Sequence, residues 1–364
     1  MPAKIGFVSD NLRQRRVAAV RACGRILSGE RPLTMRERLA GLDGLDGMPD
    51  YYGSDGPVAE LEARVAGLLG TEAAVFFPTG TMAQQVALRF GGTGAVALHP
   101  LGHLEMHERL AYAQLSGLRA VWPTTEPRNP TAAEILALAE PVSTVVVELP
   151  MRDAGFVLPT WDALVAVTGA ARTRGARVHI DGARLWESTP HLGHGLDAVA
   201  GLADSTYVSF YKTLGGLGGA ALAGTADLAA YARAWRHRHG GQVFQQWPFA
   251  LSALAGLDRE LPRVPSYVRH APTVATALAG LPGARVFPAP PHTHQFRLWM
   301  PHPADALNDA ALRLAESAGI CFVGGWRDAE VPGMALAEVT VTAPALDWTA
   351  DDVADAGSRF LALL

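Results

Sequence analysis

Short apolar runs alternate with longer amphipathic stretches over residues 57–240, and this alternation constrains the fold more than any other feature of the chain. Short apolar runs bounded by turn residues are typical of buried strands, whereas apolar residues spaced three and four apart indicate helices. The order strand–helix–strand predicts an α/β fold with a mostly parallel central sheet flanked by helices. The predicted strands are residues 73–77, 95–98, 119–122, 144–149, 177–180, 206–210 and 220–223, and the predicted helices include 58–69, 81–90, 105–115, 131–139 and 161–174.

The pattern changes after residue 248, where the helical segments lengthen. Residues 286–288, 295–300 and 337–341 are predicted strands of a smaller C-terminal α+β domain. A length of 364 residues fits two domains better than one. We therefore expect the chain to divide into an N-terminal arm over 1–30, a large domain over 31–250 and a small domain over 251–364.

Charge, hydropathy and cysteine content argue against several classes of protein. The formal net charge is −4, so the chain has no basic field to hold a nucleic acid backbone. No apolar run approaches the roughly 18 residues that a membrane span needs. The first positive charges follow a short apolar stretch, which is the reverse of a signal peptide, and Cys23 and Cys321 are too few for a disulfide framework. We expect a cytoplasmic protein that binds neither nucleic acid nor membranes.

Lysine is rare, because the 31 lysines and arginines include only Lys4 and Lys212. Lys212 follows the predicted strand 206–210 and precedes a glycine-rich segment over residues 215–219. A desolvated lysine can attack a carbonyl carbon, whereas an arginine stays charged. The alternative is a chance lysine at the edge of a loop. The glycines do not form a dinucleotide-binding loop, because they precede a strand instead of joining a strand to a helix.

Three predicted strand ends carry groups that together suit one cofactor. Gly80 and Thr81 open a helix after residues 73–77, Asp181 follows 177–180, and Lys212 follows 206–210. In an open parallel sheet, ligands bind beyond the carboxyl ends of the strands. A helix N-terminus can hold a phosphate, a buried acid can keep a pyridine nitrogen protonated, and an amine can bind an aldehyde, which are the needs of pyridoxal phosphate. Taken singly, Gly80 and Thr81 could be ordinary capping residues, and Asp181 could simply pair with Arg184.

Six motifs occur in the order typical of one enzyme family. They are FVSDN at residues 7–11, YGSDGPVAELE at 52–62, FPTGTMAQ at 77–84, HLEMHE at 103–108, HIDGARL at 179–185 and WRHRHGG at 235–241. By these motifs the chain resembles the threonine aldolase/β-eliminating lyase family of fold-type-I enzymes that depend on pyridoxal 5'-phosphate. The resemblance implies a fold-type-I transferase-like architecture, a homodimer or homotetramer with its cleft at the dimer interface, and cleavage of β-hydroxy-α-amino acids to glycine and an aldehyde.

The resemblance also implies roles for single residues. Lys212 resembles the lysine that links covalently to the cofactor, and Asp181 resembles the partner of the pyridine nitrogen. Gly80 and Thr81 resemble phosphate-binding residues. His103 resembles the histidine that stacks on the cofactor ring and assists proton transfer.

Contacts with the substrate carboxylate depart from the family pattern. The resemblance implies that Arg184 lies near the cofactor's phenolic oxygen and the carboxylate, and that Ser9 of the N-terminal arm is a second contact. The usual C-terminal arginine is missing, and Glu338 stands in or beside its place. Either Arg184 with Ser9 binds the carboxylate, or Arg327 acts as a substitute.

Further departures change the size and polarity of the expected pocket. The residue before the lysine, often serine in the family, is Tyr211, and the usual Arg-Gln pair reads Phe244-Gln245. A usual asparagine is Gln84, and the segment resembling Glu-Asn-Thr-His-Asn reads ELPMRD over residues 148–153. We expect weak activity on threonine and better activity on a bulkier β-substituted amino acid.

Three other functions remain open on the residues alone. The same cofactor site could remove a β-leaving group from a serine or cysteine derivative instead of cleaving Cα–Cβ. His99, His103 and His107 suggest a zinc site by their spacing, but Pro100 disfavours helix at residue 99 and the motif His-Glu-x-x-His is absent. A non-catalytic small-molecule sensor would be expected to lose Lys212 or Asp181, and both are present.

Overall fold

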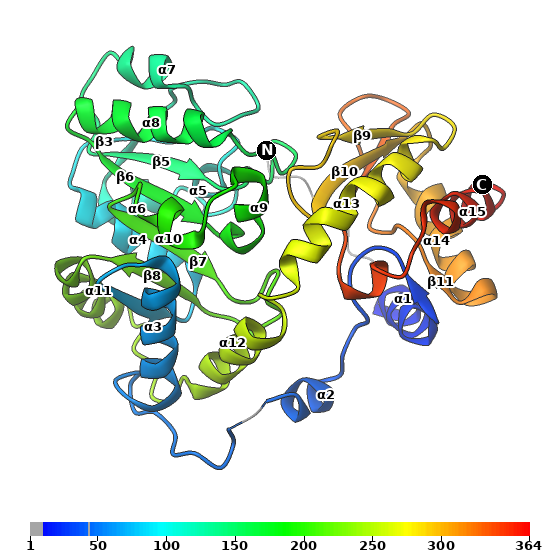
Figure 1. Cartoon of the computed structure of the whole chain (residues 1–364), viewed down its shortest axis with the longest axis horizontal. Helices are drawn as coiled ribbons and strands as arrows, with labels where there is room; N and C mark the ends of the chain where they lie inside the picture. Colours follow the sequence, from blue (N-terminus) through cyan, green and yellow to red (C-terminus); the bar gives the residue numbers. More distant parts are fainter. Residues whose placement is uncertain (1–9, 43) are drawn as a thin grey trace. The chain divides into compact units, whose positions relative to one another are not determined.

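The apolar runs between residues 73 and 224 form one sheet in the computed structural model of the chain, which describes residues 10–42 and 44–364. Within those residues the sheet has seven strands in the order β2-β8-β7-β6-β5-β3-β4 (Figure 1). The ladder from β7 to β4 is parallel, and β8 is antiparallel to both of its neighbours. The predicted mostly parallel α/β sheet is confirmed. The strands are β2 Ala73–Phe77, β3 Ala95–Ala97, β4 Arg119–Val121, β5 Thr144–Glu148, β6 Arg177–Gly182, β7 Ser205–Ser209 and β8 Ala220–Gly224.

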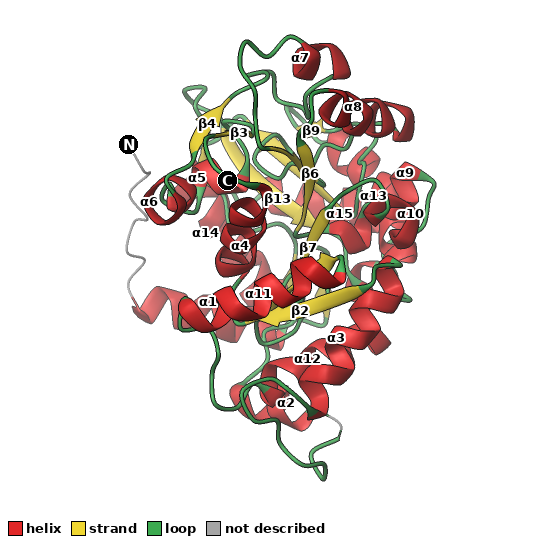
Figure 2. Cartoon of the chain, turned by 90° about the vertical axis from the view of Figure 1, so that its left-hand side faces the viewer, coloured by secondary structure: helices red, strands yellow, loops and turns green. Residues whose placement is uncertain are grey.

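Helices cover both faces of this sheet (Figures 1 and 2). One face packs against helices that include α3, α8, α10 and α12, and the other packs against helices that include α4 and α11. These helices are α3 Gly56–Leu69, α4 Gly80–Gly91, α8 Trp161–Thr173, α10 Leu196–Ala200, α11 Ala226–Arg238 and α12 Trp247–Arg259; the shorter helices of this part of the chain are α5 His103–Met106, α6 Ala111–Ser116, α7 Ala132–Leu136 and α9 Thr189–Leu192.

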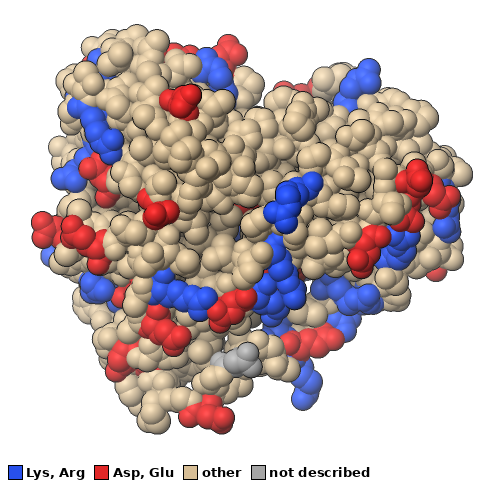
Figure 3. Space-filling view, viewed as in Figure 1, with Lys and Arg blue, Asp and Glu red and all other residues tan. Residues whose placement is uncertain are grey.

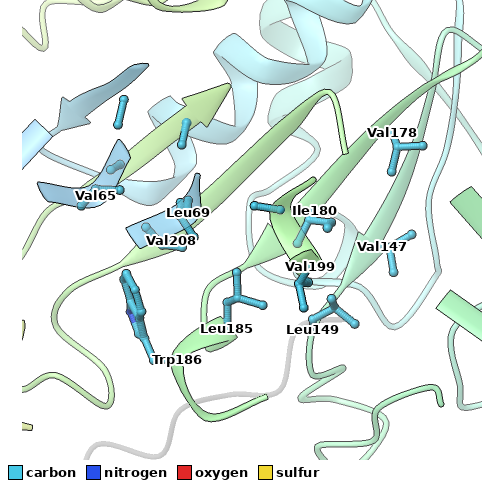
Figure 4. Packing of buried hydrophobic residues seen from close by; sticks show 14 of the residues in the cluster. Val65, Leu69, Val147, Leu149, Val178, Ile180, Leu185, Trp186, Val199 and Val208 are labelled. Atoms are coloured by element: carbon cyan, nitrogen blue, oxygen red, sulfur yellow. The ribbon is translucent and has the colours of Figure 1, made fainter. Parts of the chain in front are cut away.

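Alternation along the central strands decides which side chains reach which face. Val178, Ile180 and Val208 point into the core on the α3 side (Figure 4), whereas Tyr207 packs against α4 and α11 on the opposite side. A register slip of one residue would exchange the two faces, and fully burying one such aliphatic side chain is worth about 1.5–3 kcal/mol. The same alternation places Asp181, which is three residues after Val178, on the face that α4 covers.

The single helix predicted over residues 105–115 is wrong. The structure has α5 and α6 there, separated by a short irregular segment. Arg109 and Leu110 have φ values of 52° and 58°, in the left-handed region that a right-handed helix cannot continue through. The break lets Glu108 turn inward, where its carboxylate accepts a hydrogen bond from Gln85 of α4.

A second, smaller sheet lies in the C-terminal part of the chain. It is antiparallel in the order β12-β13-β10-β9, and a separate parallel pair joins β1 to β11. The predicted strands 286–288, 295–300 and 337–341 correspond to β9, β10 and β13, while the short strands β1, β11 and β12 were not predicted. The elements of this part are α1 Asp10–Ala22, β1 Arg25–Ile26, β9 Arg285–Phe287, β10 Gln295–Met300, α14 Ala304–Ala318, β11 Ile320–Cys321, β12 Arg327–Asp328, β13 Ala335–Thr340 and α15 Ala350–Leu361; α2 Met35–Ala40 and α13 Val264–Ala279 lie at its two junctions with the larger part.

Contacts within the chain divide it into two units, residues 39–265 and the remainder. These boundaries differ from the expected ones at residues 30 and 250. The helix α12 packs against α3 and so belongs to the larger unit, while α1 packs against α14 and so joins the smaller one instead of forming a separate arm. Each unit has its own apolar core.

Surface properties give two further facts. Among the described residues, no helix is both long enough and apolar enough to cross a membrane. On the face drawn in Figure 3, positive and negative side chains are interspersed and wide areas carry no charge.

Candidate active site

Two buried carboxyl groups stand side by side where the parallel strands end. Glu148 of β5 is the register partner of Asp181 of β6, and both side chains are buried. The strand predicted to stop at residue 180 continues through Gly182, so Asp181 lies within β6 and not in the following loop. Burial first, and then the charge of Asp181, raise the pKa of Glu148 above the usual carboxyl range.

Lys212 lies in the hairpin loop that joins β7 to β8. Backbone hydrogen bonds close this loop, from Gly216 N–H to Phe210 O (2.8 Å) and from Gly215 N–H to Lys212 O (3.0 Å). Burial, followed by the positive charge of Arg184, lowers the pKa of Lys212 to about 8, although nearby acids including Asp181 partly oppose this shift. The structure therefore brings Lys212, Asp181 and Arg184 together and gives the lysine an amine that deprotonates readily.

His103 begins α5 and faces the same groups. Its backbone N–H donates to Glu148 Oε2 (2.9 Å), and its Nδ1 lies 3.4 Å from Glu108 Oε1. Burial by itself lowers the pKa of His103, but Glu108 and Asp181 outweigh that effect and the net pKa is raised. The His103 ring thus lies near Asp181 and Lys212, and the neighbouring acids favour its protonated form.

A second histidine follows one helical turn later. The His107 ring centroid is 5.3 Å from that of His103, and His107 Nε2 lies 2.6 Å from Asp153 Oδ2. Asp153 belongs to the loop after β5, which Glu148 Oε1 anchors by accepting a hydrogen bond from Arg152 N–H (3.2 Å). This loop therefore supplies the acid of a hydrogen-bonded His–Asp pair, and the end of α5 supplies the histidine.

The N-terminus of α4 is suited to bind an anion. Thr79 caps the helix by accepting a hydrogen bond from Met82 N–H (3.3 Å), and Gly80 and Thr81 are the first two helical residues. Free N–H groups in the first turn and the helix dipole favour an anion there. A Cβ at Gly80 would lie 2.2 Å from the Tyr207 hydroxyl, so only glycine fits.

These groups fit pyridoxal phosphate. The lysine amine suits the aldehyde, Asp181 suits the pyridine nitrogen, and the start of α4 suits the phosphate. Arg184, in the turn after β6, has its guanidinium 5.5 Å from the Phe156 ring centroid and a buried Nε atom without a hydrogen-bond partner among the described residues. That orphan donor is consistent with a ligand oxygen at this position.

The remaining sequence-based candidates are Ser9, Arg327 and His99. Ser9 lies outside the described residues. Arg327 Nη2 lies 3.7 Å from Glu338 Oε1, and both belong to the smaller unit. His99 uses both ring nitrogens on the backbone, with Glu126 O and Leu101 N–H, and the described part of the chain contains no group of three His, Cys, Asp or Glu residues arranged to hold a metal.

Sequence reasoning assigned no role to three residues that shape the site, namely Glu148, Glu108 and Tyr207. For Glu148 the sequence contained a signal, because an acid at the end of the mostly apolar strand Thr144–Glu148 is unusual. Glu108 appeared within the family motif at 103–108, but its contact with Gln85 depends on the break in the helix. Tyr207 gave no signal, because an aromatic residue inside a strand is ordinary core material.

Comparisons with known proteins agree with this geometry. The family model described as beta-eliminating lyase matches residues 33–299. The low-specificity L-threonine aldolase 1 of Arabidopsis thaliana is 24% identical over 289 residues, which is 76% of this chain and 81% of that protein.

Two bacterial structures match almost the whole chain. A candidate L-allo-threonine aldolase from Listeria monocytogenes is 30% identical with a TM-score of 0.89, covering 96% of this chain and 99% of that one. A candidate aromatic amino acid beta-eliminating lyase/threonine aldolase from Exiguobacterium is 31% identical with a TM-score of 0.89, covering 96% and 100%. The expected fold-type-I architecture is confirmed, and the chain belongs to the beta-eliminating lyase family.

Proposed function

We propose that the protein cleaves the Cα–Cβ bond of a β-hydroxy-α-amino acid to give glycine and an aldehyde. Membership of the family makes the chain a lyase that depends on pyridoxal phosphate. The names of the plant and Listeria relatives support aldol cleavage as the reaction. The observation that carries the proposal is the Lys212 amine, with its pKa lowered to about 8, beside Asp181 and Arg184.

Each residue has a distinct task in this reaction. When bound, the cofactor supplies an electron sink for the pair left on Cα as Cα–Cβ breaks. Lys212 holds the cofactor aldehyde, Asp181 keeps the pyridine nitrogen protonated, and the first turn of α4 with Gly80 and Thr81 holds the phosphate. His103 stacks on the ring and moves protons: the β-hydroxyl loses one as Cβ becomes the aldehyde carbon, and Cα gains one to give glycine.

Arg184 binds the substrate carboxylate in this proposal, with Ser9 as a second contact. A charge-assisted, two-pronged arginine contact is the strongest ordinary partner for a carboxylate. Arg184→Lys should therefore raise KM strongly, because a point charge does not replace the planar fork. A KM for the amino acid within a factor of two of the wild-type value would contradict this assignment, and Arg327→Ala provides the comparison for the alternative arginine.

The experiment has two parts. Borohydride reduction of the yellow, cofactor-loaded protein should fix the cofactor to the peptide containing Lys212, and label on Lys4 or a colourless protein would contradict the proposal. The loaded enzyme is then incubated with threonine, bulkier and aromatic β-hydroxy amino acids, and cysteine conjugates. We expect glycine and aldehyde, with threonine a weak substrate because Tyr211 and Phe244 add apolar bulk. Pyruvate and ammonia without glycine would instead establish β-elimination, the activity that the name of the Exiguobacterium relative includes.

We also propose that the protein is cytoplasmic and works as a homodimer or homotetramer. An exposed aromatic cluster of the larger unit, formed by Tyr51, Tyr52 and Phe244, supports self-association. Large exposed apolar patches are typical of protein–protein contacts.

A further inference from the structure

Tyr207 is a buried tyrosine at the centre of the site to which the roles above assign nothing. It is the register partner of Asp181 on the neighbouring strand, and its side chain packs on the face that α4 covers. Only 3% of its surface is exposed. Its hydroxyl oxygen lies 2.2 Å, and its Cζ 2.8 Å, from where a Cβ on Gly80 would stand. The phenol therefore reaches from the sheet to the anion-binding end of α4.

Packing alone does not account for the hydroxyl group. The ring lies among apolar side chains of β2, β8, α4 and α11, where a phenylalanine would fill the same space. A buried hydroxyl must find hydrogen-bond partners to offset its loss of water. Tyr211, the residue next to Lys212, lies close enough to Tyr207 to influence its pKa. Burial, and then the charge of Asp181, raise the pKa of Tyr207 well above its ordinary value, so the phenol keeps its proton and can donate it.

We propose that the Tyr207 hydroxyl donates a hydrogen bond to the phosphate group of the bound cofactor. The backbone N–H groups at the start of α4 approach the phosphate from the helix side, and the phenol completes the cradle from the sheet side. The inference rests on the proposed pyridoxal phosphate chemistry and adds a phosphate ligand to it.

The test compares two cofactor forms that differ only in the phosphate. The apoprotein and its Tyr207→Phe variant are titrated with pyridoxal phosphate and with pyridoxal, and each Kd is read from the absorbance change. A hydrogen bond to a charged group is worth enough to predict about a tenfold or greater loss of pyridoxal phosphate affinity, with pyridoxal affinity unchanged. Tyr267→Phe, which alters a buried tyrosine of the smaller unit, is the matched control.

The outcomes separate this inference from the proposed function. Equal losses for both cofactor forms would mean that Tyr207 is only a structural residue, and no loss for either would likewise overturn the inference. A wild-type protein that binds neither form would overturn the proposed function, and the inference with it. The ³¹P resonance of the bound cofactor gives a second readout: it should shift in Tyr207→Phe and stay in place in Tyr267→Phe.

Discussion

At the scale of single residues, the lowered pKa of Lys212 sets how the protein takes up its cofactor. A lysine with a pKa of about 8 instead of 10.5 has far more neutral amine at pH 7, and only the neutral form attacks an aldehyde. Because the protonated amine must lose its proton before it attacks, the attachment rate should rise about tenfold per pH unit below about pH 7 and level off above about pH 9. Stopped-flow absorbance of apoprotein mixed with pyridoxal phosphate measures this profile.

Lys4→Arg removes the other lysine and is the matched control, so its profile should coincide with that of the wild type. A rate that keeps rising to pH 10 would show that the burial of Lys212 and the charge of Arg184 do not act as described.

A second prediction concerns the charge of Asp181. Its carboxylate is buried on the α4 face of β6, close enough to influence the pKa values of His103, Glu148 and Lys212. Asp181→Asn keeps the shape but removes the charge that keeps the pyridine nitrogen protonated. We expect the variant to retain much of its cofactor while turnover falls on the order of 10³-fold or more. Steady-state kinetics with cofactor occupancy read by absorbance test this, and near-normal turnover would reject the assignment.

At the scale of elements, the first turn of α4 is where helix propensity and packing oppose each other. Alanine is ordinarily more favourable than glycine in a helix by about 1 kcal/mol. At Gly80, however, the new methyl group would overlap the Tyr207 hydroxyl, and overpacking of this kind costs about 1–3 kcal/mol. Gly80→Ala should therefore lower the free energy of unfolding and weaken cofactor binding, as measured by urea denaturation and cofactor titration.

Gly67→Ala in α3 is the matched control, because a Cβ there meets nothing within 4 Å. That variant should be stabilised by up to about 1 kcal/mol and bind cofactor normally. If both variants were stabilised alike, the close contact between Gly80 and Tyr207 would be refuted.

Elements also show where sequence reasoning works and where it stops. The strands from β2 to β8 were predictable because each is a short apolar run between turn residues, and the strand ends then located Asp181 and Lys212. The break between α5 and α6 was not, because it depends on the left-handed backbone at Arg109 and Leu110. The burial of Glu148 was not predictable either. Its side chain is covered by β6 and α5, which are distant from Glu148 along the chain.

At the scale of the whole molecule, the exposed aromatic cluster predicts how copies of the chain associate. Tyr51, Tyr52 and Phe244 are each about half exposed, at 48%, 49% and 52%, and the Phe244 ring contacts both tyrosines. We expect the protein to elute as a homodimer or homotetramer, and Phe244→Arg to lower its mass in solution by light scattering. Phe287→Arg, at an exposed phenylalanine of the smaller unit, should leave the mass unchanged. A wild-type monomer, or an unaltered mass for Phe244→Arg, would refute this use of the cluster.

The antiparallel pairing of β7 with β8 bears on the order in which the site folds. A hairpin joins neighbouring segments and forms within about 1–10 μs, whereas pairing β2 with β8 or β6 with β7 must first close long loops. Pulsed hydrogen exchange during refolding should accordingly protect the amides of β7 and β8 before those of β2. The reactive amine of Lys212 is thus carried on a locally folded piece of chain, and the groups that decide what it reacts with gather around it afterwards.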